Sequence, residues 1–210
     1  FQHGATNFQA AEGMRVFHNG TAIQTAPLTA GDASDVISIG GLSMWVHKSG
    51  ERFAIRVRDP DSPARKKFTG ISWFPPDPTY RVTARFVPYG APKPAPMINI
   101  LGDIERFSSP GYVVFELGGQ TLRLEPVVSE ENDLFFVFRD GTSDRETYAA
   151  ARFLHADMPR DGQVVLDFNK AYNPPCAFNP FTTCPLPPKG NRLAIRIEAG
   201  ELMYRQKKGE

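Results

Sequence analysis

The chain has 210 residues, 41% hydrophobic and 22% charged, a composition that excludes a disordered or fibrous protein. Its 24 Lys and Arg residues balance 23 Asp and Glu residues, and the net charge of +1 predicts no nucleic-acid partner. No apolar run approaches the roughly 20 residues of a membrane-spanning helix, so we expect a soluble protein without a membrane span. The sequence starts at Phe1 instead of Met, an expected sign that an upstream segment has been removed, and localisation stays open.

Gly and Pro account for 18 and 19 residues, together more than their usual share of about 12%. This predicts many short elements separated by turns. Apolar residues seldom recur at helical spacing, and residues 62–68 are the best candidate for one or two helical turns.

Strand signals begin near the amino terminus. Residues 14–17 and 21–24 flank Asn19-Gly20, the pair favoured in two-residue hairpin turns because both positions need positive φ. Residues 42–47 and 52–58 flank the turn 48–51 and predict a second hairpin.

The middle of the chain continues the strand pattern. Residues 80–87 alternate polar and apolar side chains, as expected of a strand with one wet face. Pro92, Pro94 and Pro96 then predict a stiff connector instead of a strand. Further strands are expected at the following positions: 99–107, 111–117, 121–126, 134–138, 147–154, 164–168 and 192–198.

About a dozen strands and almost no helix predict an all-β fold, mainly antiparallel. We expect a β-barrel or a two-sheet sandwich with one or two very short helical turns, because a single sheet of this size would expose a wide apolar face. We expect residues 1–210 to form a single β domain. An exposed edge strand can pair with the edge of a second copy, so a homodimer is kept as an alternative to a monomer.

The segment 166–188 reads LDFNKAYNPPCAFNPFTTCPLPP and is the least ordinary part of the sequence. With this segment, and with the runs 55–59, 70–81, 138–142 and 191–201, the chain resembles a bacterial and archaeal family known as domain of unknown function 1684. The resemblance extends from about Gly13 to Leu202. It implies a shared fold and no assigned activity, and members usually carry a further Trp- and Gly-rich amino-terminal segment that this sequence lacks.

The residues of this segment predict a long, rigid, Pro-rich loop over 169–191, because proline removes backbone donors and restricts the chain. In one interpretation, Asp167, Asn169 and Asn173 hold the loop shut through local hydrogen bonds. In the other, the same side chains and Tyr172 line a pocket.

Cys176 and Cys184 lie in this loop and are the two cysteines of the sequence. They are either a disulfide, which requires an oxidising compartment, or two free thiols. The scattered His residues lack metal-ligand spacing, so we expect no metal and no cofactor. As a free thiol, Cys176 would need His155 as its base, with Asp157 as the orienting carboxylate.

Arginines on several strands suggest an anion site. Arg56 and Arg58 share one strand face, and Arg81 and Arg152 come from other strands, so their guanidinium groups could hold a carboxylate or phosphate if they met. The alternative is a solvated strand face paired with nearby acids. Trp73 is either a stacking wall for the same site or a plug of the core.

These observations leave three hypotheses. The first is a binding domain for a small polar or anionic ligand beside residues 166–188, with Arg56, Arg58, Trp73, Arg81, Arg152, Asp167, Asn169, Tyr172, Asn173 and Cys176 as site residues. The second is a hydrolase-type enzyme in the same place, using Cys176 with His155, or Tyr172 with Asp167. The third is a structural or interaction module without a pocket. The sequence does not decide whether the protein is an enzyme.

Overall fold

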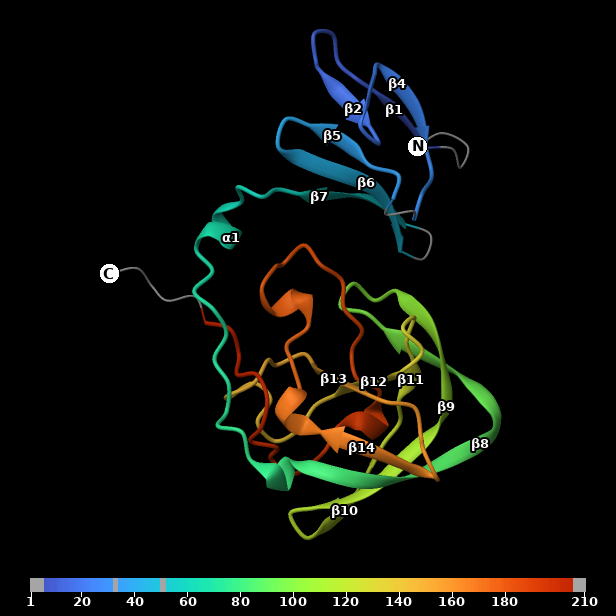
Figure 1. The fold of residues 1–210 in the computed structure, drawn as a ribbon, viewed down its shortest axis with the longest axis vertical. Coiled ribbons are helices and arrows are strands. Elements are labelled where there is room, and N and C mark those ends of the chain that lie inside the picture. Colours follow the sequence, from blue (N-terminus) through green and yellow to red (C-terminus); the bar gives the residue numbers. More distant parts are fainter. Residues whose placement is uncertain (1–5, 32–33, 50–51, 206–210) are drawn as a thin grey trace. The chain divides into compact units, whose positions relative to one another are not determined.

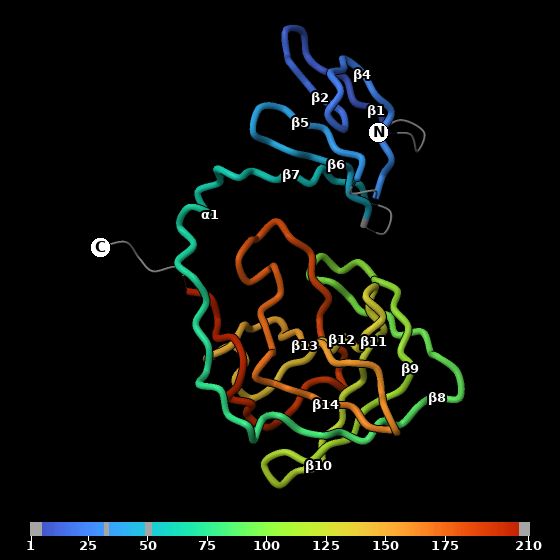
Figure 2. The backbone as a smooth tube through the Cα atoms, viewed as in Figure 1, coloured from blue at the N-terminus to red at the C-terminus, as the bar shows by residue number. Residues whose placement is uncertain are grey.

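A computed structural model describes residues 6–31, 34–49 and 52–205. Contacts between Cα atoms group the chain into two compact units, residues 1–68 and residues 69–210, and each is described by itself. Figures 1 and 2 show the path of the chain within each unit. The single domain expected over residues 1–210 stays a prediction, which calorimetric unfolding tests: one cooperative transition supports it and two contradict it.

The first unit contains two antiparallel sheets. Its strands are β1 (Thr6–Gln9), β2 (Val16–His18), β3 (Thr21–Ile23), β4 (Thr25–Leu28), β5 (Ile37–Ile39), β6 (Leu42–Ser49) and β7 (Arg52–Arg58). One sheet pairs β1 with β4, and the other has the order β3-β2-β5-β6-β7. The buried apolar side chains are few, Val16, Ala26, Ile37 and Val46.

Both hairpins expected in the first unit are present. Strands β2 and β3 pair around Asn19 and Gly20, whose φ angles of 46° and 84° are the positive values that the turn requires. Strands β6 and β7 pair from Ser43 opposite Arg58 to Ser49 opposite Arg52. Part of the turn expected at 48–51 lies outside the described residues.

The helical turn expected at residues 62–68 is α1 (Pro63–Lys66). Ser62 caps it, because its side-chain oxygen accepts a hydrogen bond from the backbone N–H of Arg65 at 3.2 Å. Pro63 occupies the first turn, where a missing N–H donor has no cost. Among the described residues, no helix is long and apolar enough to span a membrane.

The second unit also contains two antiparallel sheets. Its strands are β8 (Arg81–Ile98), β9 (Ile104–Leu117), β10 (Gln120–Leu124), β11 (Val127–Val128), β12 (Leu134–Phe138), β13 (Arg152–Ala156) and β14 (Gln163–Asp167). The sheet orders are β10-β9-β8-β14 and β11-β12-β13. Four short 3₁₀ turns complete the described elements, η1 (Pro78–Tyr80), η2 (Phe168–Lys170), η3 (Pro175–Ala177) and η4 (Lys189–Asn191).

The main core lies between these two sheets. It takes alternate residues from these strands, β11 excepted, for example Val113 and Phe115 of β9 and Phe136 and Phe138 of β12. Every second residue of a strand points to the same face, so this alternation commits one face of each sheet to the core. Burying these side chains against each other is the dominant stabilising term of the unit.

The three-stranded sheet is covered on its other face as well. Val137 and Phe153 belong to a second apolar cluster with Met97 and Cys184, which come from the far half of β8 and from the loop after η3. The long β8–β9 hairpin and the loop at 169–191, green and orange in Figure 1, supply this cover. Strand β12 is therefore apolar on both faces.

The predicted connector at Pro92, Pro94 and Pro96 is wrong, since these residues lie within β8. Strand β14 pairs only with residues 81–85 of β8, so from Lys93 onward β8 pairs with β9 alone among the described strands. Prolines two residues apart place their nitrogens on the same side of a strand, and an edge without a partner strand tolerates them. A register shift separates Pro88 from Lys93.

Three further strand predictions differ from the structure. The strand expected at 99–107 starts at Ile104, because residues 99–103 form the turn between β8 and β9. Residues 192–198 form an isolated β-bridge at Arg192 and no strand, and the Ile197 carbonyl accepts a hydrogen bond from the Arg152 side chain. The strand expected from residue 147 starts at Arg152, since Thr147 belongs to a turn and its backbone N–H donates to the Thr142 carbonyl.

The fold is all-β and sandwich-like, as expected, with one short helix and a few 3₁₀ turns among the described residues. All ladders between the named strands are antiparallel. Of the two architectures left open by the sequence, the sandwich holds, because none of the four sheets in the described part of the chain closes into a barrel.

Candidate functional site

Asn169 and Asp167 hold the start of the loop in place. The Asn169 side chain accepts from the backbone N–H of Asp77 and donates to the Asp77 carbonyl, both at 2.9 Å. Asp167 accepts from the Asn169 backbone at 3.2 Å and from its side chain at 3.0 Å. These bonds join the end of β14 to η1.

Asn173 and Asn191 are buried and also bind backbone. The Asn173 side chain donates to the Leu202 carbonyl at 2.8 Å, and its backbone N–H donates to Glu201 at 2.7 Å. Asn191 accepts from the N–H of Glu125 and donates to the carbonyls of Glu125 and Val137. The asparagines of this region therefore hold the loop through hydrogen bonds, as in the first of the two interpretations of the sequence.

Arg152 is a core residue and is 1% exposed. Its guanidinium donates to Asp140 at 2.5 Å, to the Ile197 carbonyl at 3.0 Å and to the Ala199 carbonyl. Burial lowers the pKa of Arg152, and the charge of Asp140 opposes that shift. Arg152 is committed to this ion pair and is not available to an external anion.

The other candidate residues are divided between the two units. Arg56 and Arg58 lie on β7 of the first unit, where Arg56 contacts His47 at 3.4 Å and Arg58 stacks over Trp45 at 4.8 Å. Arg81 begins β8 in the second unit, opposite Asp167. Trp73 is 48% exposed and forms an isolated β-bridge with Glu201, which contradicts neither a stacking wall nor a structural role.

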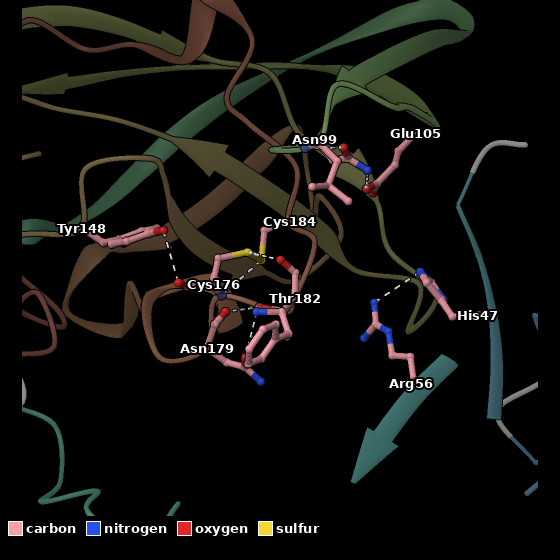
Figure 3. Close-up of a disulfide and its surroundings, with 11 residues drawn as sticks. His47, Arg56, Asn99, Glu105, Tyr148, Cys176, Asn179, Thr182 and Cys184 are labelled. Carbon is pink, nitrogen blue, oxygen red and sulfur yellow. Dashed lines mark hydrogen bonds between the residues drawn. A yellow bond between two sulfur atoms is a disulfide. The ribbon is translucent and has the colours of Figure 1, made fainter. Parts of the chain in front are cut away.

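Cys176 and Cys184 form a disulfide with a Cα–Cα distance of 6.4 Å. Figure 3 shows the bond with Tyr148, whose hydroxyl donates to the Cys176 carbonyl at 3.3 Å. The segment after Cys184 is fastened to the β8–β9 hairpin, because Ile100 donates to the Cys184 carbonyl and Leu186 donates to the Ile98 carbonyl. A bonded Cys176 cannot serve as a nucleophile, so the Cys176–His155 hypothesis is wrong in this structure.

The structure instead connects Asp133, His155 and Tyr172 in one hydrogen-bonded chain. His155 Nδ1 lies 2.8 Å from Asp133 Oδ2, and His155 Nε2 lies 3.0 Å from Tyr172 Oη. The His155 side chain is 36% exposed and that of Asp133 is 24% exposed. The chain of bonds is therefore accessible to solvent, unlike the Arg152–Asp140 pair.

Strand register explains how these residues meet. Phe135 pairs with His155 in the β12–β13 ladder, so Asp133, two residues before Phe135, is on the same face of the sheet and is a diagonal neighbour of His155. Tyr172 reaches the same side because its backbone forms two 2.9 Å hydrogen bonds with Phe153, two residues before His155 on β13. Ser129 holds Asp133 through a side-chain hydrogen bond.

Sequence reasoning selected Tyr172 and His155 but missed Asp133. It paired His155 with Asp157 and Tyr172 with Asp167, and the structure pairs them with neither. The local signal at Asp133 is a Ser129–Asp133 turn before a strand, which is typical of ordinary hairpin connections. Only the register of β12 against β13 distinguishes Asp133 from the other acids.

Hydrogen-bond chemistry determines which of Asp133, His155 and Tyr172 donates a hydrogen bond and which accepts it. An ionised carboxylate only accepts, so His155 donates from Nδ1 to Asp133. In the neutral imidazole, Nε2 then accepts from the Tyr172 hydroxyl, and in the imidazolium it donates to the Tyr172 oxygen. The arrangement can pass a proton between Tyr172 and His155.

The surroundings of Tyr172 are apolar and negative. Burial raises the pKa of the Tyr172 phenol above its ordinary value, and the charges of Asp133, Glu131 and Glu201 raise that pKa further. Tyr172 is therefore held in its protonated form, in which it can donate a hydrogen bond. The described residues contain no group of three or more His, Cys, Asp or Glu side chains placed to hold a metal ion.

The fold and this site together define an all-β, sandwich-like protein with a Tyr-His-Asp hydrogen-bonded chain beside a disulfide loop. The chain belongs to the family described as "Protein of unknown function (DUF1684)", whose family model matches residues 66–202. The match confirms the family named from the sequence, and it leaves the run 55–59 outside the matched range. No curated protein matches the chain.

A solved structure supports the same assignment. The solution NMR structure of an uncharacterized protein of Haloarcula marismortui is similar, with a TM-score of 0.56 and 34% sequence identity. The similarity covers 67% of this chain and 80% of that one. It shows a shared fold and carries no activity to this chain.

Proposed function

We propose that the second unit binds a small polar ligand at Tyr172, His155 and Asp133, beside residues 166–188. The observation that carries this proposal is the chain of hydrogen bonds on both ring nitrogens of His155, at 2.8 and 3.0 Å. It aligns three polar side chains at a partly exposed place, whereas Asn169, Asn173 and Asn191 bind backbone.

The charge around the site favours a neutral or cationic ligand. Three carboxylates raise the Tyr172 pKa by disfavouring the phenolate, and the same field would repel an external anion. Of the arginines that would hold an anion, Arg152 is buried in its ion pair with Asp140, and Arg58 stacks over Trp45. The sequence predicts a polar or anionic ligand. The charges around Tyr172 restrict the proposed class to hydrogen-bonding molecules without negative charge.

A rigid setting supports binding at this place. Tyr172 and Cys176 pack against the same apolar cluster, which includes Phe153 and Cys184. Phe153 contacts the Tyr172 ring edge-on at 5.7 Å and 84°. Side chains fixed in this way lose little conformational entropy when a ligand binds, which increases affinity.

A second candidate function is a hydrolase-type enzyme that uses the same three residues. The hydrogen-bonded residues favour it: water would attack the substrate while Tyr172 gives its proton to the leaving group, and the proton that the water releases would return to Tyr172 through His155, with Asp133 orienting the ring. This assignment replaces Cys176 and Asp167 of the sequence hypothesis with Tyr172 and Asp133.

Two-dimensional NMR of the isotope-labelled full chain tests the binding function. The probes are glycerol, urea, trimethylammonium and acetate, which represent neutral, cationic and anionic chemistry. We expect saturable shifts of the His155 and Phe153 signals with a neutral or cationic probe, and their loss in Tyr172→Phe. The matched control is Tyr148→Phe, which removes another hydroxyl of the same region.

The outcomes separate the three hypotheses. Shifts that persist in Tyr172→Phe, or that appear only with acetate, contradict the proposed site. Absence of binding in all classes favours the interaction module. Turnover of p-nitrophenyl esters or glycosides that is lost in His155→Gln identifies the enzyme, and binding without turnover leaves the binding domain.

A further inference from the structure

A cavity in the first unit lies far in sequence from the Tyr172 site. Its walls come from both sheets of that unit and include Phe8 of β1, Leu28 of β4, Ile37 of β5, Met44 and Val46 of β6, and Ile55 of β7. Its volume is about 170 Å³. The family model begins at residue 66, so these residues lie outside the matched range.

Strand register explains why apolar side chains converge here. Ile37 pairs with Met44, and Val46 pairs with Ile55, so these four residues share one face of the five-stranded sheet. On the smaller sheet, Thr6 pairs with Leu28, and Phe8 lies two residues after Thr6 on the same face. Both faces contribute walls to the cavity.

The exposed fractions of the lining residues show that the cavity is buried at one end and open to solvent at the other. Ile37 is fully buried and Val46 is 3% exposed, whereas Ile55 is 59% exposed. A ligand can therefore enter from the surface and reach buried apolar side chains. Interiors are close-packed, and a void of this size leaves its walls without contact partners.

The chemistry of the walls selects the ligand. Seven of the nine lining residues are apolar, and the other two, Thr6 and Asn7, are polar without charge. A charged molecule would lose its hydration here and find no partner charge among these residues.

We propose that this cavity is a binding site for one small, neutral, apolar molecule of about the size of benzene or toluene. The size follows from the volume, because an engineered apolar cavity of about 150 Å³ in another protein binds benzene. The proposal does not depend on the function of the Tyr172 site.

Methyl NMR of the full chain, with toluene as the probe, tests this site directly. We expect saturable shifts of the Ile37, Ile55 and Met44 methyl signals and no shift of Ile197, which is buried in the core of the second unit. Benzoate is the matched probe, since it carries the same ring with a negative charge, and it should leave all these signals in place.

A cavity-filling variant provides the second measurement. Leu28→Phe enlarges a half-buried wall residue, and we expect toluene binding to weaken by roughly tenfold or more, since small changes of apolar volume alter affinity on that scale. Leu101→Phe is the control, because Leu101 lies in the second unit and is 55% exposed.

Several outcomes would overturn the proposal. Toluene shifts that do not saturate, or that spread equally over Ile197, show nonspecific partitioning. Equal binding of benzoate contradicts an apolar site, and unchanged affinity in a folded Leu28→Phe places the ligand elsewhere. If Leu28→Phe does not fold, the comparison of toluene with benzoate on the unmodified chain decides alone.

Discussion

His155 and Tyr172 are joined by both their rings and their polar atoms. Their ring centroids lie 6.0 Å apart with 14° between the planes, and His155 Nε2 is 3.0 Å from Tyr172 Oη. Phe135 contacts the same imidazole at 4.8 Å. Aromatic packing thus sets the orientation of His155, and the hydrogen bonds to Asp133 and Tyr172 set its proton positions.

This environment predicts a raised pKa for Tyr172. An ultraviolet pH titration of the chain, compared with Tyr172→Phe, isolates the Tyr172 phenol among six tyrosines. We expect it to titrate above the ordinary tyrosine value of about 10, because burial and three carboxylates disfavour the phenolate. Asp133→Asn should lower this pKa toward the ordinary value.

The same shift predicts how stability varies with pH. The folded pKa of Tyr172 is higher than the unfolded one, so its contribution to stability is complete below about pH 10 and is lost as pH rises through the folded pKa. Urea unfolding at several alkaline pH values should show a steeper loss in the natural chain than in Tyr172→Phe. Equal slopes would contradict the raised pKa.

The buried pair of Arg152 and Asp140 predicts a large effect on folding. Asp140→Ala leaves the Arg152 guanidinium, 1% exposed, without its counter-charge. We expect a loss of about 3–5 kcal/mol in the free energy of unfolding, measured with urea. Arg196→Gln is the control, because Arg196 pairs with Glu146 and Glu198 at an exposed place and should change stability little.

Equal losses in Asp140→Ala and Arg196→Gln would contradict the structural role of the buried pair. Asp140 also accepts from Thr142, so the double variant Asp140→Ala, Arg152→Leu separates the two contributions. Recovery of stability in the double variant assigns the loss to the unpaired arginine.

Local patterns were sufficient to predict much of the fold. Asn19-Gly20 and the apolar run at 134–138 mark a hairpin and a buried strand, because turn chemistry and side-chain patterning act over a few residues. The proline connector failed for a long-range reason. Nothing near Pro94 shows that β14 ends its pairing at Arg85 and leaves an edge there.

The site was predictable only in part, for a similar reason. Tyr172 and His155 were chosen from the sequence, but their partners depend on which strands pair. Asp133 reaches His155 through the β12–β13 register, and the carbonyls of Ile197 and Ala199 turn Arg152 inward. Long-range register and buried hydrogen bonds leave no local trace in a single sequence.

The disulfide predicts a measurable contribution to stability. The double variant Cys176→Ser, Cys184→Ser should lose about 2 to 3 kcal/mol in the free energy of unfolding, since the bond closes a short loop and restricts the unfolded chain. Mass spectrometry before and after reduction checks that the natural chain is oxidised. A reductant that destabilises both proteins equally would show that the bond is absent.

Gly200 predicts a link between backbone conformation and the Tyr172 site. Its φ of +80° suits glycine, and an added Cβ would lie 2.4 Å from the carbonyl oxygen of Ala171, the residue before Tyr172. We expect Gly200→Ala to cost at least about 1–3 kcal/mol in urea unfolding, because the alanine is strained and the carbonyl must move.

The displacement should also be visible at the site itself. The backbone N–H of Glu201 donates to the same Ala171 carbonyl at 2.8 Å, so a shift there moves Tyr172 relative to His155 and shifts the NMR signals of both residues. Gly190→Ala is the matched control, since a Cβ at Gly190 meets no atom within 4 Å and its φ is not positive. If the two variants unfold alike and leave the His155 signals unchanged, the Ala171 contact does not position Tyr172.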